Sequence, residues 1–300
     1  MDISVVICTY NRSRHLKNIL NSLAEQEVSD ELIWEIVVID NNSKDDTKDV
    51  AEDFKLKTPI PVKYFTEEKQ GLSHARNRGI VESEGKYVAF TDDDAIAEKN
   101  WVATLHQGLM RYGCECVGGK IFLKTDEELP KWLIKELWGF LGYLDYGDEH
   151  LSFDSEHYPF GGNMVFAREV FDRIGFFNPN YGRIGSKDFG GEEYELFTRF
   201  LKTGGKGTYM PSAIVYHVIG QEKLQKQYFR KIHYRAGEQR ALNEAAQYNR
   251  TIYGIPFFLF PQLFRTITKY MTKPTMRMQM NVWWIMGFIR GRIDIYLQNK

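Results

Sequence analysis

The chain has 300 residues and a mass of 35.1 kDa, with 43% hydrophobic and 26% charged residues. This length can bury a sizeable core in one large domain or two smaller ones, and the composition excludes disordered, collagen-like and disulfide-rich proteins. Three cysteines cannot form a complete disulfide framework, and no apolar leader opens the chain. We therefore expect a reducing, cytoplasmic setting.

The charge is distributed unevenly along the chain. The formal net charge is −1, but residues 221–300 carry 14 Lys and Arg against 4 Asp and Glu, and residues 1–220 carry 25 against 36. A basic segment can bind nucleic acid or an anionic membrane surface. An acidic body argues against nucleic acid as the partner of the whole protein, so we expect no nucleic-acid binding.

Short apolar runs alternate with helical patterns over the first hundred residues. Strands are predicted at 3–8, 33–39, 62–65 and 87–90, and helices around 16–23 and 72–82. This alternation predicts an α/β fold with a mostly parallel sheet that is covered by helices. In such sheets, polar residues just beyond the carboxyl ends of the strands form the ligand crevice.

The pattern changes after residue 120. Residues 120–154 are rich in aromatic residues and weakly periodic, which fits either a mobile acceptor-binding loop or an insertion with a small core of its own. A strand is then predicted at 164–167, a helix at 168–174, another helix after Gly191, and a strand at 213–218.

Asp92, Asp93 and Asp94 directly follow a predicted strand. Three adjacent carboxylates repel one another unless a cation is present. Mg²⁺ or Mn²⁺ binds such oxygens together with substrate phosphates. The alternative is a solvated acidic turn.

Two further positions have both a chemical and a structural interpretation. Glu192 and Glu193 follow Gly191 at the start of a predicted helix, where a carboxylate can act as a general base or simply complement the helix dipole. His217 lies near the end of an apolar strand, where it is either a metal ligand or a buried core histidine.

The order of five motifs resembles that of family-2 glycosyltransferases with the GT-A fold, over residues 3 to about 220. The motifs are SVVICTYNR at 4–12, VVIDNNS at 37–43, GLSHARNRGI at 71–80, DDD at 92–94 and GEE at 191–193. The resemblance implies a catalytic domain at 1–220, with a nucleotide-sugar-binding half at 1–119 and an acceptor-binding half at 120–220. A helical extension at 221–300 follows.

The same resemblance implies inverting, metal-dependent transfer of a sugar from a nucleoside-diphosphate donor, most commonly UDP, to a hydroxyl of a glycan or lipid-linked acceptor. By position it assigns Thr9, Tyr10, Arg12, Asp40, Arg76, Asp92 and Asp93 to the nucleotide sugar, Asp92, Asp94 and His217 to Mn²⁺ or Mg²⁺, and Gly162, Asn163 and Trp132 to the sugar pocket. The base is Glu193 or Glu192, because this chain has Glu-Glu where the family usually has Glu-Asp.

Two other functions were considered. A non-catalytic nucleotide- or glycan-binding module on the same fold is disfavoured because carboxylates for both the metal and the base are present. Nucleotidyl transfer would require a triphosphate-binding signature near the N-terminus, and TYNR at 9–12 does not resemble one.

The C-terminal extension is predicted to begin with a basic helix at 221–250. Apolar runs follow at 252–264 and 282–289, each shorter than the ~20 residues that span a bilayer. Lys and Arg beside Trp and Phe are typical of a segment that lies at a membrane interface. We therefore expect peripheral attachment to the inner face of the cell membrane, and the alternative is a helical subdomain that packs on the protein.

Overall fold

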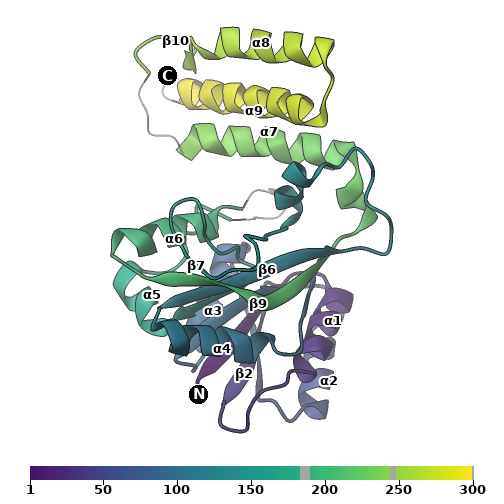
Figure 1. The fold of residues 1–300 in the computed structure, drawn as a ribbon, viewed down its shortest axis with the longest axis vertical. Coiled ribbons are helices and arrows are strands. Elements are labelled where there is room, and N and C mark those ends of the chain that lie inside the picture. The colour runs from purple at the N-terminus through teal and green to yellow at the C-terminus, as the bar shows by residue number, and fades with distance from the viewer. Residues whose placement is uncertain (183–189, 244–247, 299–300) are drawn as a thin grey trace. The chain divides into compact units, whose positions relative to one another are not determined.

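The structure is a computed structural model that describes residues 1–182, 190–243 and 248–298. It divides into two compact units. Of the described residues, the first comprises 1–124, 142–182 and 190–219, and the second comprises 125–141, 220–243 and 248–298. Figure 1 shows the sheet of the first unit and the helices of the second.

The first unit is built on a sheet that has nine strands among the described residues, in the order β3-β2-β1-β4-β8-β6-β9-β5, with β7 paired to β9. The strands are β1 (Ile3–Thr9), β2 (Trp34–Asp40), β3 (Val62–Thr66), β4 (Tyr87–Asp92), β5 (Ala95–Ala97), β6 (Cys116–Lys124), β7 (Leu151–Ser152), β8 (Asn163–Ala167) and β9 (Gly207–Val218). Strands β3, β2, β1 and β4 are parallel to one another, whereas β8 runs antiparallel to β4 and β6.

Helices flank this sheet (Figure 1). They are α1 (Ser13–Ala24), α2 (Thr47–Lys57), α3 (Leu72–Glu82), α4 (Trp101–Tyr112), α5 (Arg168–Ile174) and α6 (Glu192–Lys202). The α/β class predicted from the sequence is confirmed. Helix α4 and strand β6 were not predicted, although the apolar positions of α4 recur at helical spacing.

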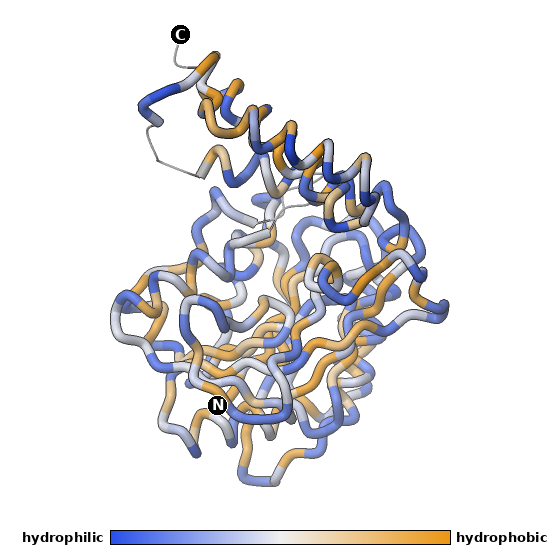
Figure 2. The backbone as a smooth tube through the Cα atoms, turned by 45° about the horizontal axis from the view of Figure 1, so that its top comes forward, coloured by the Kyte–Doolittle hydropathy of each residue, from blue (hydrophilic) through white to orange (hydrophobic). Residues whose placement is uncertain are grey.

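The core explains why these segments form strands. Every residue of β2 is buried, and β1 is buried except for Cys8, so both faces of these central strands are covered. Continuous β-branched runs are typical of such parallel strands. The apolar strand segments appear as orange stretches inside this unit in Figure 2. Buried strands that end in polar residues fix the position of those residues at the sheet's edge.

The second unit is mainly helical. It contains 3₁₀ helices η1 (Lys135–Leu141) and η2 (Gln221–Leu224), helices α7 (Lys226–Asn243), α8 (Leu259–Thr272) and α9 (Met276–Gln298), and the short strands β10 (Thr251–Ile252) and β11 (Ile255–Pro256). Helix α7 packs along α9, and Gly287 permits this close approach, because a Cβ there would overlap the backbone oxygen of Tyr234. Among the described residues, no helix combines the length and the apolar character that crossing a bilayer requires.

Candidate active site

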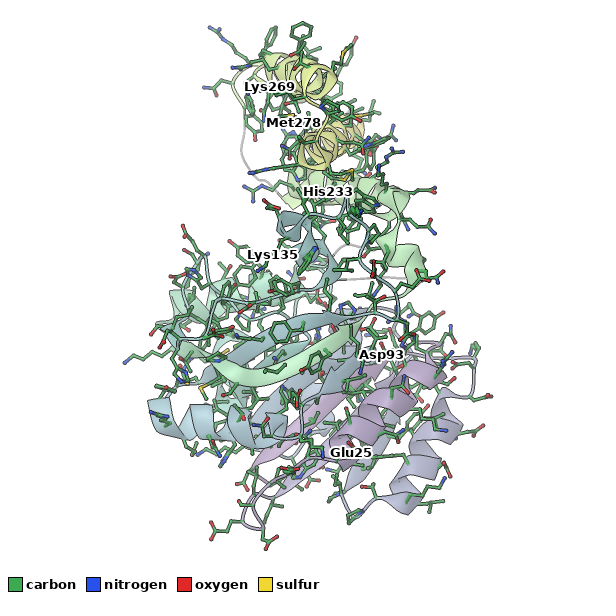
Figure 3. The ribbon with its side chains drawn as sticks, turned by 45° about the vertical axis from the view of Figure 1, so that its right-hand side comes forward. Glu25, Asp93, Lys135, His233, Lys269 and Met278 are labelled. Carbon is green, nitrogen blue, oxygen red and sulfur yellow. The ribbon has the colours of Figure 1, made fainter. Side chains whose placement is uncertain are left out.

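Three predicted site residues lie together because the strands that carry them are parallel neighbours. Strand register places Thr9 beside Asp40 and Cys8 beside Asp92, so β1, β2 and β4 all end at the same edge of the sheet. Figure 3 shows Asp93 at this edge. In open α/β sheets this edge is where ligands bind.

Two of the three consecutive aspartates, Asp93 and Asp94, are buried and contact the same arginine, Arg12. Arg12 donates from Nη1 to Asp93 Oδ1 at 3.0 Å and to Asp94 Oδ2 at 2.8 Å, and Thr9 Oγ1 donates to Asp93 Oδ2 at 2.8 Å. Burial, reinforced by the charge of Asp94, raises the pKa of Asp93 to about 6. Burial alone would lower the pKa of Arg12, but the two carboxylates outweigh it and raise that pKa. The guanidinium therefore compensates a concentration of negative charge.

His217 contacts Asp94 at Oδ1, whereas Arg12 contacts the other carboxylate oxygen of Asp94, Oδ2. Antiparallel pairing of β5 with β9 sets Ala95 beside His217, and His217 Nε2 lies 3.2 Å from Asp94 Oδ1. A carboxylate and an imidazole at this separation suit a divalent cation. No group of three or more possible ligands occurs among the described residues. These two side chains would thus hold Mn²⁺ or Mg²⁺ with substrate phosphates and water as the remaining ligands.

Asp92 differs from the two aspartates that follow it, because 43% of its side chain is exposed. Its Oδ1 lies 3.5 Å from Arg76 Nη2. A Cβ on Gly162 would lie 2.8 Å from Asp92 Oδ2, so only glycine leaves this carboxylate its present position. The structure thus brings Asp92, Arg76 and Gly162 together.

Arg76 also pairs with the first of the two candidate bases. Its Nη1 lies 2.7 Å from Glu192 Oε1, and only 4% of the Arg76 side chain and 3% of the Glu192 side chain are exposed. Burial lowers the pKa of Arg76, but the charges of Glu192 and Asp92 outweigh it and raise that pKa. The second oxygen of Glu192, Oε2, is buried without a hydrogen-bond partner. Glu192 is thus held inside the protein by one arginine.

Glu193 lies in a different environment, although it is the next residue in the first turn of α6. Its side chain is partly exposed, and its Oε2 accepts a hydrogen bond from the Gly191 N–H at 3.3 Å. Tyr158 lies close enough to feel the charge of Glu193: burial and this charge together raise the pKa of Tyr158 to about 12. Of the two glutamates, Glu193 is the one that a second substrate can reach.

Asp40 was assigned to the nucleotide-sugar site, and it lies at the end of β2. This side chain is buried, accepts a hydrogen bond from the Ser43 N–H at 2.8 Å, and accepts another from the Tyr64 hydroxyl at 2.5 Å. Tyr10, which directly follows Thr9 at the end of β1, is exposed. Sequence analysis missed Asn41, whose Oδ1 accepts a hydrogen bond from the Gly71 N–H at 2.7 Å and so fixes the start of α3. The position of Asn41 directly after a buried strand is the sequence feature that could have identified it.

Two residues assigned to the sugar pocket have side-chain contacts of their own. Asn163 is fully buried: its Nδ2 donates to the backbone oxygens of Lys120 and Ala213, and its Oδ1 accepts a hydrogen bond from Trp101 Nε1. This side chain ties three strands to α4, and its role in the sugar pocket stays a prediction. Trp132 belongs to the second unit, where its ring packs edge-on against Phe229, and its role stays a prediction.

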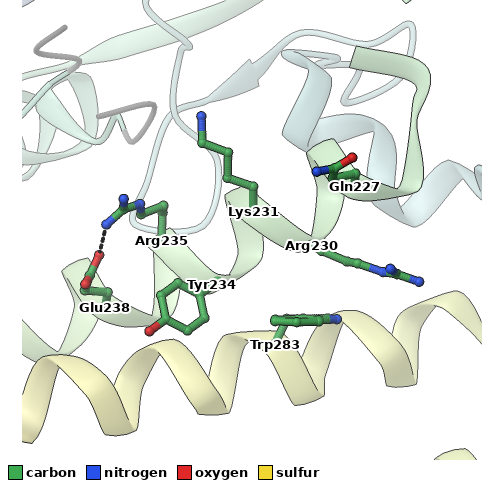
Figure 4. A pocket seen from close by; sticks show the side chains of 7 residues that line it. All are labelled: Gln227, Arg230, Lys231, Tyr234, Arg235, Glu238 and Trp283. Carbon is green, nitrogen blue, oxygen red and sulfur yellow. Dashed lines mark hydrogen bonds and ion pairs between the residues drawn. The ribbon is translucent and has the colours of Figure 1, made fainter. Parts of the chain in front are cut away.

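The second unit has a basic hollow of its own, with a volume of about 660 Å³ (Figure 4). Its lining comes from α7 and α9: Gln227, Arg230, Lys231, Tyr234, Arg235, Glu238 and Trp283. Arg235 forms an ion pair with Glu238 at 2.6 Å, and Arg230 Nε is buried without a hydrogen-bond partner. The hollow carries an excess of positive charge.

Comparison with known proteins identifies the family. The model of Glycosyl transferase family 2 matches residues 4–175, which is more than half of the chain. The chain belongs to this family. Residues Thr9, Asp40, Arg76 and Asp92–Asp94 all lie inside the matched region. The predicted GT-A fold and glycosyltransferase activity are confirmed.

Among its relatives is the glucosyl-dolichyl phosphate glucuronosyltransferase of Haloferax volcanii, 29% identical over 231 residues that cover 75% of this chain and 72% of the relative. Among solved structures, the mannosyltransferase PcManGT from Pyrobaculum calidifontis in complex with GDP-Man and Mn²⁺ has a TM-score of 0.64 at 15% identity, covering 97% of this chain and 87% of that one. TarS 1-349 from S. aureus in complex with UDP-GlcNAc has a TM-score of 0.55 at 18% identity, covering 99% and 83%. These likenesses establish the fold.

Proposed function

We propose that this family-2 glycosyltransferase moves a sugar from a nucleoside-diphosphate donor, with UDP as the nucleotide, to a hydroxyl of a glycan or lipid-linked acceptor. The observation that carries the proposal is the position of Arg76, which lies within 3.5 Å of Asp92 and 2.7 Å of Glu192. A single side chain thus joins the aspartate cluster to the pair of glutamates. A reaction that needs a metal ion and a general base can take place between the aspartates and the glutamates.

The aspartate side of the site binds the donor. Asp94 and His217 hold Mn²⁺ or Mg²⁺, and the ion supplies positive charge to the departing diphosphate when it is bound. Arg12 adds a second positive charge in the same cluster, and Asp40 provides a carboxylate for the nucleoside. A solved structure of the same fold contains GDP-Man and Mn²⁺, and another contains UDP-GlcNAc, which supports a nucleotide sugar and a divalent metal.

The glutamate side of the site activates the acceptor. Glu193 accepts the proton of the acceptor hydroxyl while that oxygen forms a bond to the anomeric carbon. The bond from this carbon to the diphosphate oxygen breaks on the opposite face, so the configuration inverts. Glu192 does not take this role, because its carboxylate is buried and paired with Arg76. It instead positions the start of α6.

Three successive parts of the chain have different roles in this proposal. Residues 1–119 form the donor half, residues 120–220 the acceptor half, and residues 221–300 attach the enzyme to an anionic membrane on its inner face. The excess of 14 basic over 4 acidic residues supports this attachment, as does the basic hollow between α7 and α9. A relative whose name specifies glucosyl-dolichyl phosphate supports a lipid-linked acceptor.

A panel of nucleotide sugars tests this function. Release of nucleoside diphosphate is measured with each donor in Mn²⁺ and again in EDTA, with water or a lipid-linked glycan as acceptor. We expect release from one UDP-sugar, at a rate that falls in EDTA and rises with acceptor. Equal rates with and without metal would contradict the metal role, and a GDP- or dTDP-sugar as the active donor would contradict the nucleotide.

A further inference from the structure

Helix α8 presents a row of large apolar side chains to solvent. Phe257 just before the helix is followed by Phe260, Phe264, Ile267 and Met271, at intervals of three and four residues, and all are exposed. Phe264 is 69% exposed and Met271 is 77% exposed. We call these five residues the α8 stripe. Their spacing places them on one side of a helix.

The stripe is separate from the face by which α8 packs. Leu259 is buried in the small core that α8 forms with α9, and Leu263 packs against the same core. Phe260 and Phe264 lie one position after Leu259 and Leu263, which is a rotation of about 100° around the helix, and Ile267 and Met271 continue the same exposed side. Packing within the second unit therefore leaves the stripe uncovered.

Positive charges border the stripe. Arg265 directly follows Phe264 and Lys269 lies two positions after Ile267, which places both on the polar side of α8, and Lys273 and Arg277 follow its C-terminal end. Figure 3 shows Lys269 on this helix, and Figure 2 shows apolar and hydrophilic residues alternating along it. No Asp or Glu occurs in the sequence between Glu244 and Asp294. An apolar row beside Lys and Arg is the pattern of a helix that lies in a membrane interface.

We propose that α8 docks on an anionic membrane, with the α8 stripe inserted among the lipid chains and the bordering Lys and Arg at the lipid phosphates. The inference rests on the proposed attachment of residues 221–300 and specifies the helix and side chains that perform it. A second copy of the chain fits this surface less well, because residues 245–293 contain Lys and Arg but no Asp or Glu, so two such segments would bring like charges together.

Charge and apolar insertion make separate contributions that salt distinguishes. Attraction of Arg265 and Lys269 to lipid phosphates weakens as ionic strength rises. Burial of Phe264 and its neighbours is insensitive to such screening. Binding that begins through charge and is retained through the stripe is therefore expected to weaken with salt without disappearing.

Flotation of the full chain with vesicles tests the proposal. Vesicles of phosphatidylcholine with phosphatidylglycerol are compared with vesicles of phosphatidylcholine alone, for the wild type, Phe264→Asp and Ile267→Asp. Leu56→Asp is the matched control, because Leu56 is 87% exposed on α2 in the first unit. We expect the wild type and the control to float with anionic vesicles. Partitioning of the two α8 variants should fall by about tenfold or more.

The possible failures are distinguishable. A wild type that does not float contradicts attachment altogether, whereas α8 variants that float as the wild type does contradict only the role of the stripe. Light scattering that shows a wild-type dimer, split by Phe264→Asp, would assign the stripe to a second copy instead. Metal-dependent release of nucleoside diphosphate without acceptor is measured on each variant, and we expect it unchanged, so a failure of the catalytic proposal is detected independently.

Discussion

Arg76 on α3 and Glu192 on α6 form an ion pair of 2.7 Å in the interior of the first unit. The two residues are 116 positions apart in the sequence. A buried carboxylate needs a compensating charge, and Arg76 provides it while also lying beside Asp92. The pair therefore fixes the start of α6 relative to the aspartate cluster, and it leaves Glu193 as the more accessible of the two glutamates.

Removing one partner of this pair should strongly destabilise the first unit. Arg76→Met leaves Glu192 buried without a counter-charge, and we expect the free energy of unfolding to fall by about 3 to 5 kcal/mol. Urea denaturation followed by circular dichroism measures this change. The double variant Arg76→Met/Glu192→Met should recover part of the loss. A loss below about 1 kcal/mol, which is typical of exposed pairs such as Asp53 and Lys57, would contradict the structural role.

Asp94 and His217 should control metal dependence. Each single variant, Asp94→Ala or His217→Ala, removes one of the two proposed metal ligands. The Mn²⁺ concentration for half-maximal donor turnover should therefore rise about tenfold or more in each. His157→Ala is the control, because His157 is an exposed histidine that contacts only Asp154 among the ion pairs described. Unchanged Mn²⁺ dependence in both ligand variants would place the metal elsewhere.

Arg12 should stabilise the aspartate cluster when metal is absent. Arg12→Ala leaves Asp93 and Asp94 buried with less compensating charge, so the melting temperature in EDTA should fall by about 2 to 4 °C for each kcal/mol lost. Mn²⁺ with UDP should recover much of the difference, because the ion replaces the missing charge. Calorimetry in EDTA and in Mn²⁺ with UDP measures both effects. An equal deficit in the two buffers would contradict this role.

His233 should make the second unit sensitive to acid. The side chain is buried on α7, with Nδ1 2.8 Å from the Phe229 backbone oxygen, and burial lowers its pKa. The histidine therefore binds a proton more readily in the unfolded chain than in the folded one. As the pH falls below the ordinary histidine pKa of about 6.5, the free energy of unfolding decreases. Melting temperatures at pH 7.5 and 5.5 should differ less in His233→Gln than in the wild type. An equal difference would rule out this contribution.

Local patterns were sufficient to predict the central strands and the ends at which site residues lie. The buried runs before Thr9, Asp40 and Asp92 marked three strand ends, and parallel pairing brings such ends together. The pairing of Arg76 with Glu192 was not predictable, because it depends on how α3 and α6 approach across the sheet. The hydrogen bonds of Asn163 were not predictable for a related reason, because they reach Lys120 and Ala213, which are far away in the sequence.

The most direct test compares Glu193→Gln with the wild type and with Glu192→Gln. Transfer to acceptor is measured at saturating donor, and donor affinity in Mn²⁺ is measured by calorimetry. If Glu193 is the proposed general base, Glu193→Gln should lower kcat by about 10²- to 10⁴-fold with donor affinity and melting temperature unchanged. Glu192→Gln should instead lower the melting temperature. Wild-type turnover in Glu193→Gln would contradict the assignment of the base and the mechanism built on it.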